Sequence, residues 1–365
     1  MAESAERAHN NSMHRTALCA AADAERSASR SHGQWLPLLR RDAMKAMLRL
    51  SSAIAIALLP TVCTAQIARL EIHPIQSVTM TDQDFLNGRK DGKLVMLAGQ
   101  LRIPRPGADK LPAVVLLHGS GGVGTNVVDW EQEFNSMGVA TFVLDAFSGR
   151  GIVATTTNQG QLGRLAMTYD AYRALEILEK HSRIDPQRIA VMGFSRGGQA
   201  ALYASVKRFQ RMHGPGAGRD FAAYIPFYAS CGTKFIDDDE VSPHPIRMFH
   251  GAADNYVPVT PCRDYVGRLK AKGANVTLTE YPGAHHVFDG RAFKTPVVAA
   301  KSQSTRNCQL AEAQNGVEVN VKTGQAFSYA DPCVELGPTI AYDEKAHAEA
   351  LKAVKEFVAA TLLRP

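Results

Sequence analysis

The sequence predicts an α/β fold in which a mainly parallel central sheet is flanked by helices. After residue 66, short apolar runs alternate with segments whose apolar residues recur at helical spacing. Glycine-rich turns follow these runs at 119–124, 149–151 and 193–198, where such sheets place their ligand-binding loops. The 365 residues are 45% hydrophobic and 21% charged, a composition that supports a large core and excludes wholesale disorder.

The alternation sets the order of the elements. Strands are expected at Lys93–Pro104, Ala113–His118, Ala140–Ala146, Ile189–Phe194, Ala222–Ala229, Ile246–Gly251 and Val276–Tyr281. Helices are expected at Asp129–Gly138, Leu162–His181, Gly198–Phe209, Thr260–Gly273 and Asp343–Leu363. The final helix has Ala, Leu, Val and Phe at helical spacing and an aspartate at its start that can cap it.

Residues 288–340 lack helical periodicity. Asn315-Gly316 and Thr323-Gly324 flank an alternating segment at 317–321, which predicts a small hairpin. A segment of about 50 residues cannot supply much core of its own. We therefore expect a disulfide-closed insertion before the C-terminal helix, within a single domain spanning 66–365.

The leader at residues 44–65 has the pattern of a secretory signal peptide. A short basic region precedes an apolar run too brief to span a bilayer, and small residues end the segment at Ala65. Residues 1–43 are expected to be a disordered extension or a wrongly chosen start. The pair Arg40-Arg41 leaves both Sec and twin-arginine export open. The mature protein is predicted to be periplasmic or secreted, without a stable membrane anchor after cleavage.

The net charge of +6 gives no reason to expect a nucleic-acid partner. Residues 1–65 hold eight Lys and Arg against five acidic residues, which is half of the positive excess. The remaining residues contain no basic run.

Four cysteines follow the leader: Cys231, Cys262, Cys308 and Cys333. An even number in an oxidising compartment predicts two disulfides, for which three pairings exist. We favour Cys231–Cys262 and Cys308–Cys333, because the second pair closes a compact loop. No Cys-x-x-Cys pair occurs, so zinc is not expected.

The most informative motif is Gly193-Phe194-Ser195-Arg196-Gly197-Gly198, directly after a β-branched run. A serine hydroxyl is a weak nucleophile, so it needs a tight strand-to-helix turn where a base reaches it and backbone N–H groups face the developing oxyanion. The glycines allow such a turn. Ser195 is therefore the predicted nucleophile.

A nucleophile on such a turn needs a carboxylate and then a histidine later in the chain. Asp254 ends a predicted strand at a glycine-containing loop, and His286 follows the strand 276–281. The adjacent His285 is the less favoured base. His250 and His118 are expected to be structural histidines.

Two backbone donors are expected to form an oxyanion hole. One is the N–H of Arg196, and the other belongs to Ser120 in the loop His118-Gly-Ser-Gly-Gly122. The loop is not followed by Gly-Lys-Ser/Thr, so no nucleotide cofactor is expected. The side chains of Arg150 and Arg196 are candidates for contacting an acidic group of a substrate, with solvated or ion-paired arginines as the alternative.

Five motifs in order resemble the dienelactone hydrolase family of α/β hydrolases. They are His118-Gly-Ser-Gly-Gly122, Asp145-Ala-Phe-Ser-Gly-Arg-Gly151, Gly193-Phe-Ser-Arg-Gly-Gly198, Gly251-Ala-Ala-Asp254 and Tyr281-Pro-Gly-Ala-His-His-Val-Phe288. The resemblance implies an eight-stranded α/β-hydrolase sheet and a triad carried by Ser195, His286 and Asp254. The cytosolic members use cysteine as nucleophile and a carboxylate in the loop at 119–120. With a serine and a signal peptide, this chain looks like the exported esterases of the family.

These observations predict an exported serine hydrolase that cleaves carboxylic ester or lactone bonds of a small-molecule substrate, without cofactor or metal. Two alternatives remain: a peptidase with the same triad, and a non-catalytic binding module on a hydrolase scaffold. The sequence does not indicate an oligomeric state.

Overall fold

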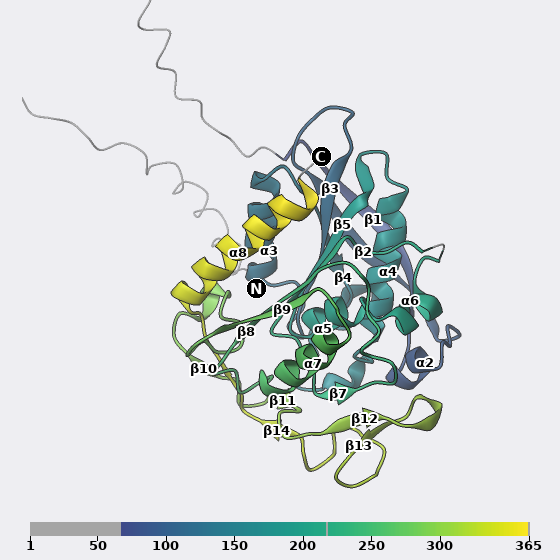
Figure 1. The fold of residues 1–365 in the computed structure, drawn as a ribbon, viewed down its shortest axis with the longest axis vertical. Helices are drawn as coiled ribbons and strands as arrows, with labels where there is room; N and C mark the ends of the chain where they lie inside the picture. The colour runs from purple at the N-terminus through teal and green to yellow at the C-terminus, as the bar shows by residue number, and fades with distance from the viewer. Residues whose placement is uncertain (1–66, 217, 364–365) are drawn as a thin grey trace, which may run out of the picture. The chain divides into compact units, whose positions relative to one another are not determined.

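The computed structural model describes residues 67–216 and 218–363, and an eight-stranded sheet forms the centre of this part (Figure 1). The predicted fold class is confirmed. The extension 1–43 and the predicted signal peptide 44–65 lie outside the described residues.

The sheet has the order β1-β2-β4-β3-β5-β6-β8-β9. The strands are β1 (Arg69–Thr79), β2 (Lys93–Ile103), β3 (Leu111–Leu117), β4 (Ala140–Asp145), β5 (Ile184–Phe194), β6 (Ala223–Phe227), β8 (Ile246–Gly251) and β9 (Val276–Tyr281). β2 runs antiparallel to both β1 and β4, whereas β4, β3, β5, β6, β8 and β9 are mutually parallel. The loops that follow the parallel strands therefore meet at one edge of the sheet.

Strand β1 was not among the strands expected from the apolar pattern. Its outward face carries Leu70 and Ile72, which are 53% and 65% exposed, so the alternation of apolar and polar residues is weak. It also contains Pro74, which lacks a backbone N–H. An edge strand tolerates proline because its outer side needs no ladder hydrogen bond.

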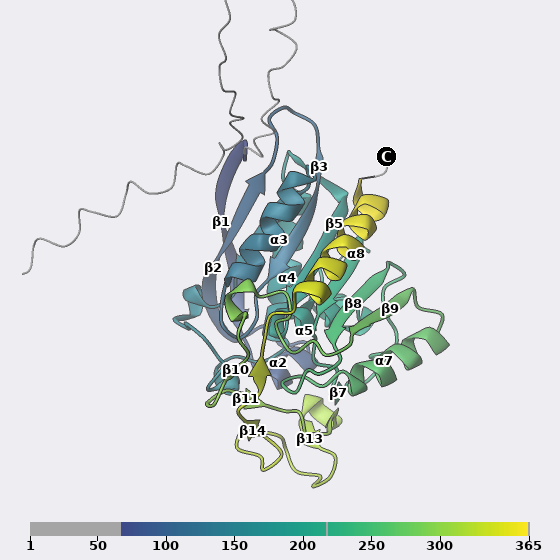
Figure 2. The same cartoon turned by 90° about the vertical axis from the view of Figure 1, so that its left-hand side faces the viewer.

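Helices cover both faces of the sheet (Figures 1 and 2). On one face α3 (Thr125–Ser136) and α8 (Glu344–Leu362) pack over the parallel strands, with Trp130 and Val354 among their buried side chains. On the other face lie α4 (Ala166–Glu179), α5 (Arg196–Tyr203), α6 (Lys207–His213) and α7 (Thr260–Ala271). The short helix α2 (Asp82–Leu86) connects β1 to β2.

The single helix predicted at 198–209 is wrong, because the structure has two helices there. The chain leaves α5 through a turn in which the Ser205 hydroxyl donates to the carbonyl of Leu202 at 2.6 Å. Val206 is extended and pairs with Val241. A serine that bonds its own preceding turn competes with helix continuation.

The insertion consists of short two- and three-residue strands. They are β10 (Val297–Val298), β11 (Gln303–Ser304), β12 (Leu310–Glu312), β13 (Glu318–Asn320), β14 (Glu335–Leu336) and β15 (Thr339–Ile340). β12 and β13 form a hairpin around Asn315-Gly316, as predicted, and β12 also pairs with β7 (Thr233–Lys234) in the loop after β6.

Both favoured disulfides are present. Cys231–Cys262 joins the loop after β6 to α7, and Cys308–Cys333 closes the insertion on itself. The expectation drawn from cysteine count and spacing is confirmed.

His213 ends α6 and is buried against α2. Its ring stacks on Phe85 at a centroid distance of 4.1 Å, and its Nε2–H donates to the Phe85 carbonyl at 2.7 Å. Burial lowers the pKa of His213 to about 4 from its ordinary 6.5, and the charges of Lys90, Arg173 and Arg208 act in the same direction.

This pKa makes folding stability depend on pH. Between about pH 6.5 and pH 4 the unfolded chain takes up a proton at residue 213 that the folded chain binds poorly, so stability falls as the pH falls. We expect this residue alone to lower the free energy of unfolding by about 3 kcal/mol over that range. Urea unfolding of the wild type and of His213→Gln across the range measures it. The variant should gain in relative stability as the pH drops, and a constant difference between the two would contradict the assignment.

Candidate active site

Ser195 lies on the tight turn between β5 and α5. Its backbone has φ 54° and ψ −112°, a conformation that L-residues rarely adopt. Glycines make the turn possible: a Cβ at Gly193 would lie 2.0 Å from the Gly197 carbonyl oxygen, and one at Gly197 would lie 2.2 Å from the Leu117 carbonyl oxygen. The turn places the Ser195 hydroxyl at the carboxyl edge of the sheet.

The structure brings Ser195, His286 and Asp254 into one hydrogen-bonded row. His286 Nε2 lies 2.9 Å from Ser195 Oγ, and His286 Nδ1 lies 2.6 Å from Asp254 Oδ2. The three residues follow β5, β9 and β8, whose carboxyl ends meet at this edge. His286 and Asp254 are 2% and 5% exposed, so their contact is shielded from water.

Asp254 is held as a carboxylate. Its Oδ1 accepts from the backbone N–H groups of Tyr256 and Val257, both at 2.8 Å. Burial acts to raise the pKa of Asp254, but the charge of His286 and hydrogen bonds from His250 and His286 outweigh it and hold the pKa well below its usual range. An ionised Asp254 accepts the Nδ1–H of His286 and leaves Nε2 free to accept a proton.

The other predicted histidines take structural positions. His250 Nε2 donates to the Val257 carbonyl at 2.7 Å and lies 3.5 Å from Asp254 Oδ2. His118 is fully buried between the Gly119 carbonyl at 2.7 Å and the Ala146 N–H at 3.1 Å. Burial lowers the pKa of His118, so it stays neutral. Among the described residues, His285 makes no hydrogen bond to Ser195, His286 or Asp254.

A buried network behind His286 was not expected from the sequence. The ring of Tyr228 lies edge-on to His286 at a centroid distance of 4.7 Å. Its hydroxyl donates to Asp289 Oδ1 at 2.8 Å, and Trp130 Nε1 donates to Asp289 Oδ2 at 2.9 Å. Burial raises the pKa of Asp289, and the two donors oppose that rise. These bonds hold the loop that carries His286 against α3.

The loop after β3 lies beside Ser195. Gly122 N–H donates to the Gly119 carbonyl at 3.1 Å, and a Cβ at Gly119 would lie 3.5 Å from that of Ser195. In the part of the chain that the structure describes, neither the Ser120 N–H nor the Arg196 N–H donates to a protein group. Both donors are therefore unpaired next to Ser195.

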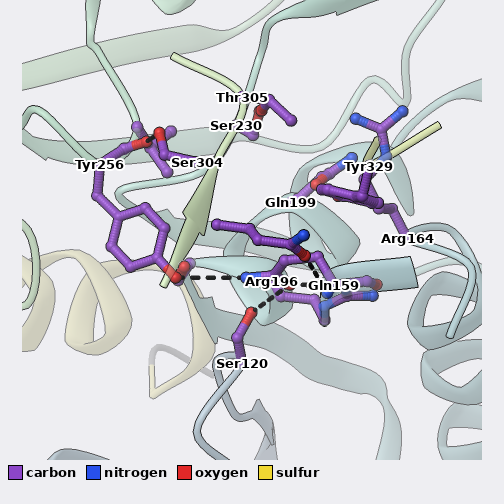
Figure 3. Close-up of a pocket in the computed structure, with 13 residues that line it drawn as sticks. Ser120, Gln159, Arg164, Arg196, Gln199, Ser230, Tyr256, Ser304, Thr305 and Tyr329 are labelled. Atoms are coloured by element: carbon purple, nitrogen blue, oxygen red, sulfur yellow. Dashed lines mark hydrogen bonds between the residues drawn. The ribbon is translucent and has the colours of Figure 1, made fainter. Parts of the chain in front are cut away.

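Gln159 joins these two residues through their side chains (Figure 3). Its Oε1 accepts from the Ser120 hydroxyl at 3.0 Å, from Arg196 Nη2 at 2.8 Å and from the Thr155 hydroxyl at 3.2 Å. Its Nε2 donates to the Tyr256 hydroxyl at 3.3 Å. No sequence motif marks Gln159, which belongs to the irregular loop before α4.

The guanidinium of Arg196 has a structural position. It is buried and donates to the carbonyl oxygens of Leu162, Gly163 and Gln159 at 2.8 to 3.4 Å. Burial lowers the pKa of Arg196. Arg196 therefore ties the loop before α4 to the start of α5.

Arg150 lies outside the site, which corrects its expected contact with an acidic substrate group. Its guanidinium makes a bidentate ion pair with Asp170 at 2.8 and 2.9 Å, and it also donates to the carbonyls of Val78 and Ala146. Both charged side chains are nearly inaccessible to solvent. The Asp170 carboxylate on α4 is fully buried and requires a charged partner. Of the two roles that the sequence left open for Arg150, the structure therefore shows the ion-paired arginine.

Two cavities meet at Ser195. The polar cavity, of about 50 Å³, is lined mainly by polar side chains (Figure 3). The apolar cavity, of about 270 Å³, is lined by His286, Val287, Phe293 and Ile340 among others. Ser120, Ser195 and Tyr256 border both.

A possible metal-ligand group is distant from this site. Of the described residues, only Glu71, His73 and His181 bring three potential ligand atoms together, near the amino end of β5. The Nδ1 of His181 accepts from the Arg183 N–H at 3.2 Å, which leaves the proton on Nε2, where it bonds Glu71 at 3.1 Å. A metal would need that Nε2 unprotonated, so this arrangement suits a hydrogen-bonded carboxylate and not a metal.

Comparison with solved structures shows the same fold. A dienelactone hydrolase from Klebsiella pneumoniae, described as putative, has a TM-score of 0.51 and 13% identity, covering 79% of this chain and 99% of that one. A dienelactone hydrolase-like promiscuous phosphotriesterase, P91, from metagenomic libraries has 0.52 and 16%, covering 80% and 98%. Esterase 2 of Thermogutta terrifontis, phosphorylated by paraoxon, has 0.50 and 18%, covering 81% and 95%.

A model of the dienelactone hydrolase family matches residues 98–362, which include every residue of the row around Ser195. The resemblance inferred from the motifs is confirmed. The chain belongs to the dienelactone hydrolase family and is a hydrolase that acts on ester bonds.

Proposed function

We propose that this protein is an exported serine hydrolase that cleaves carboxylic ester or lactone bonds through an acyl-enzyme on Ser195. The observation that carries the proposal is the position of His286, whose two ring nitrogens contact Ser195 Oγ and Asp254 Oδ2. A base bonded to the hydroxyl and oriented by a carboxylate is the arrangement that activates serine.

The first half of the reaction forms the acyl-enzyme. His286 Nε2 takes the hydroxyl proton while Ser195 Oγ bonds to the carbonyl carbon. The negative charge that develops on the carbonyl oxygen is received by the unpaired N–H groups of Ser120 and Arg196, and Asp254 stabilises the imidazolium. His286 then gives its proton to the leaving oxygen as the ester bond breaks.

The second half restores the enzyme. Water gives a proton to His286 and its oxygen attacks the acyl carbon, and Ser195 leaves with the proton returned from Nε2. The products are the carboxylic acid and the alcohol, or a hydroxy acid from a lactone. Apart from water and the substrate, every step uses only the side chains and backbone N–H groups named above.

Export is supported by two disulfides and by the basic and apolar pattern of residues 44–65. Disulfides persist in oxidising compartments. Among the described residues, no helix combines the length and apolar character needed to cross a membrane. We propose a periplasmic or secreted location and a domain extending from about residue 66 to the end.

Labelling by a fluorophosphonate probe tests the nucleophile without knowledge of the substrate. We expect the wild type to be labelled on Ser195, because His286 activates this hydroxyl, and to hydrolyse a short aryl ester. Ser195→Ala should lose both. The control Ser136→Ala changes an exposed serine and should retain both. No labelling of a folded, disulfide-intact protein would favour the binding module, and cleavage of peptides but not esters would favour the peptidase.

Gln159 is a positioning residue in this proposal. Replacement by Met keeps its size but removes the acceptor shared by Ser120 and Arg196, so both backbone donors are less well placed. A single oxyanion donor is typically worth about 100- to 1000-fold in kcat. We expect Gln159→Met to lower kcat by about tenfold or more with little change in KM, measured on a short aryl ester. Gln161→Met, an exposed glutamine in the same turn, is the matched control. Equal kcat values in the two variants would contradict this role.

A further inference from the structure

We propose that the two cavities divide the substrate at the scissile bond, the apolar cavity holding the alcohol and the polar cavity holding a short, uncharged acyl group that carries a hydroxyl or keto oxygen. The substrate class is thus an ester of a small hydroxy or keto acid with an apolar alcohol. This inference rests on the proposed function, since it takes Ser195 as nucleophile and His286 as proton donor.

The position of His286 decides which side receives the alcohol. In acyl transfer the leaving oxygen must lie within hydrogen-bond reach of the group that protonates it. His286 lines the apolar cavity and is absent from the lining of the polar cavity. The alcohol therefore leaves toward the apolar cavity, and the acyl chain extends from the carbonyl carbon into the polar one.

The apolar cavity suits an aryl or branched alkyl group. Val287, Phe293, Ala299 and Ile340 line it, and Tyr228 presents an aromatic ring beside His286. No Lys, Arg, Asp or Glu lines it. Burial of apolar surface here is favourable by roughly 25 cal/mol for each Å² removed from water.

The polar cavity holds hydrogen-bonding groups without partners. Gln199 on α5 is 4% exposed and lines the cavity, and its side-chain amide has no hydrogen-bond partner among the described residues. The hydroxyls of Ser230 and Thr305 also line it without a partner in the described part. The amide atoms of Gln199 are not among the fully buried atoms without a partner, so they are accessible from the cavity, and a ligand oxygen there can accept from the amide N–H.

The charged groups of the polar cavity are already engaged. The guanidinium of Arg196 donates to carbonyl oxygens, and Arg164 is ion-paired with Glu318 of the insertion. The neutral side chains of the lining without a partner in the described part of the chain include Gln199, Ser230 and Thr305. Arg164 Nε is buried without a hydrogen bond to the described residues, but the charge of Arg164 is balanced by Glu318 and by Asp82, whose Oδ2 lies 3.6 Å from that nitrogen. The cavity therefore matches a neutral hydroxyl or keto oxygen better than a carboxylate.

Size limits the acyl group further. The polar cavity measures about 50 Å³, against about 270 Å³ for the apolar cavity. A chain of a few non-hydrogen atoms fits. Val257 is the only aliphatic side chain in its lining, so a plain alkyl chain there would leave the polar groups unpaired.

The test compares three phenyl esters that share a leaving group: 2-hydroxypropanoate, propanoate and hemisuccinate. Each kcat/KM is divided by the rate of hydroxide hydrolysis to remove intrinsic reactivity. We expect the 2-hydroxypropanoate to be preferred over propanoate by about tenfold, the size of one hydrogen bond. Propanoate hydrolysed as well as the hydroxy ester, or hemisuccinate hydrolysed faster, would overturn the proposal.

Gln199→Leu tests the residue that carries the preference. We expect the ratio of hydroxy ester to propanoate to fall toward one, whereas Gln161→Leu, an exposed change, keeps the wild-type ratio. Fluorophosphonate labelling of both variants shows that the site is folded. A wild-type ratio in labelled Gln199→Leu would remove Gln199 from acyl recognition and overturn the proposal.

A second comparison tests the alcohol side. Benzyl and glyceryl esters of 2-hydroxypropanoic acid differ chiefly in the polarity of the alcohol, and we expect the benzyl ester to be preferred. The opposite order overturns the assignment of the apolar cavity. A labelled, active enzyme with reversed preferences leaves the serine mechanism intact, whereas loss of labelling and hydrolysis overturns the mechanism and this inference together.

Discussion

The strained turn at Ser195 is the constraint on which the active site depends. A non-glycine residue at φ 54° carries a conformational cost of about 1–3 kcal/mol, so its neighbours must hold it in place. They do so by close packing: a Cβ at Gly197 would collide with the carbonyl oxygens of Leu117 and His118, and one at Gly193 with that of Gly197. Because Leu117 ends β3, the contact that permits the turn also brings the Gly119–Gly122 loop beside Ser195.

Electrostatics around this turn follow from burial and hydrogen bonding. Asp254 remains ionised in a nearly dry position because two backbone N–H groups and His286 compensate its charge. The guanidinium of Arg196 is compensated by carbonyl dipoles instead of a carboxylate.

Motifs predicted the residues whose chemistry requires a particular local backbone. Ser195, Asp254 and His286 each follow a strand and a glycine-containing turn, a local pattern that can be recognised in the sequence. Gln159 carries no such pattern, because its role comes from four side chains that converge on it in space. The sequence left two roles open for Arg150, because its partner Asp170 lies on α4 and cannot be identified from spacing.

The secondary structure also divides into elements that local sequence patterns predict and elements that depend on long-range pairing. Parallel strands buried on both faces appear as continuous apolar runs and were predicted. The edge strand β1 was missed, because its pairing with β2 and not its own pattern makes it a strand. The break between α5 and α6 depends on the pairing of Val206 with Val241, which is equally invisible in a local window.

The insertion supplies walls to both cavities although it has little core of its own. Phe293, Ala299 and Ile340 face the apolar cavity, and Gln303, Ser304, Thr305 and Tyr329 face the polar one. Strands of two or three residues cannot hold such walls in register alone.

The links that hold the insertion are covalent and ionic. Cys308–Cys333 closes it, and a loop of this length is stabilised by about 3 kcal/mol when cross-linked. Arg164 and Arg208 pair with Glu318 and Glu312 of the insertion. The insertion thus lines both cavities, whereas Ser195, Asp254 and His286 lie on loops that the sheet itself positions. Because disulfides persist in oxidising compartments, such a compartment preserves the Cys308–Cys333 bond that closes the insertion.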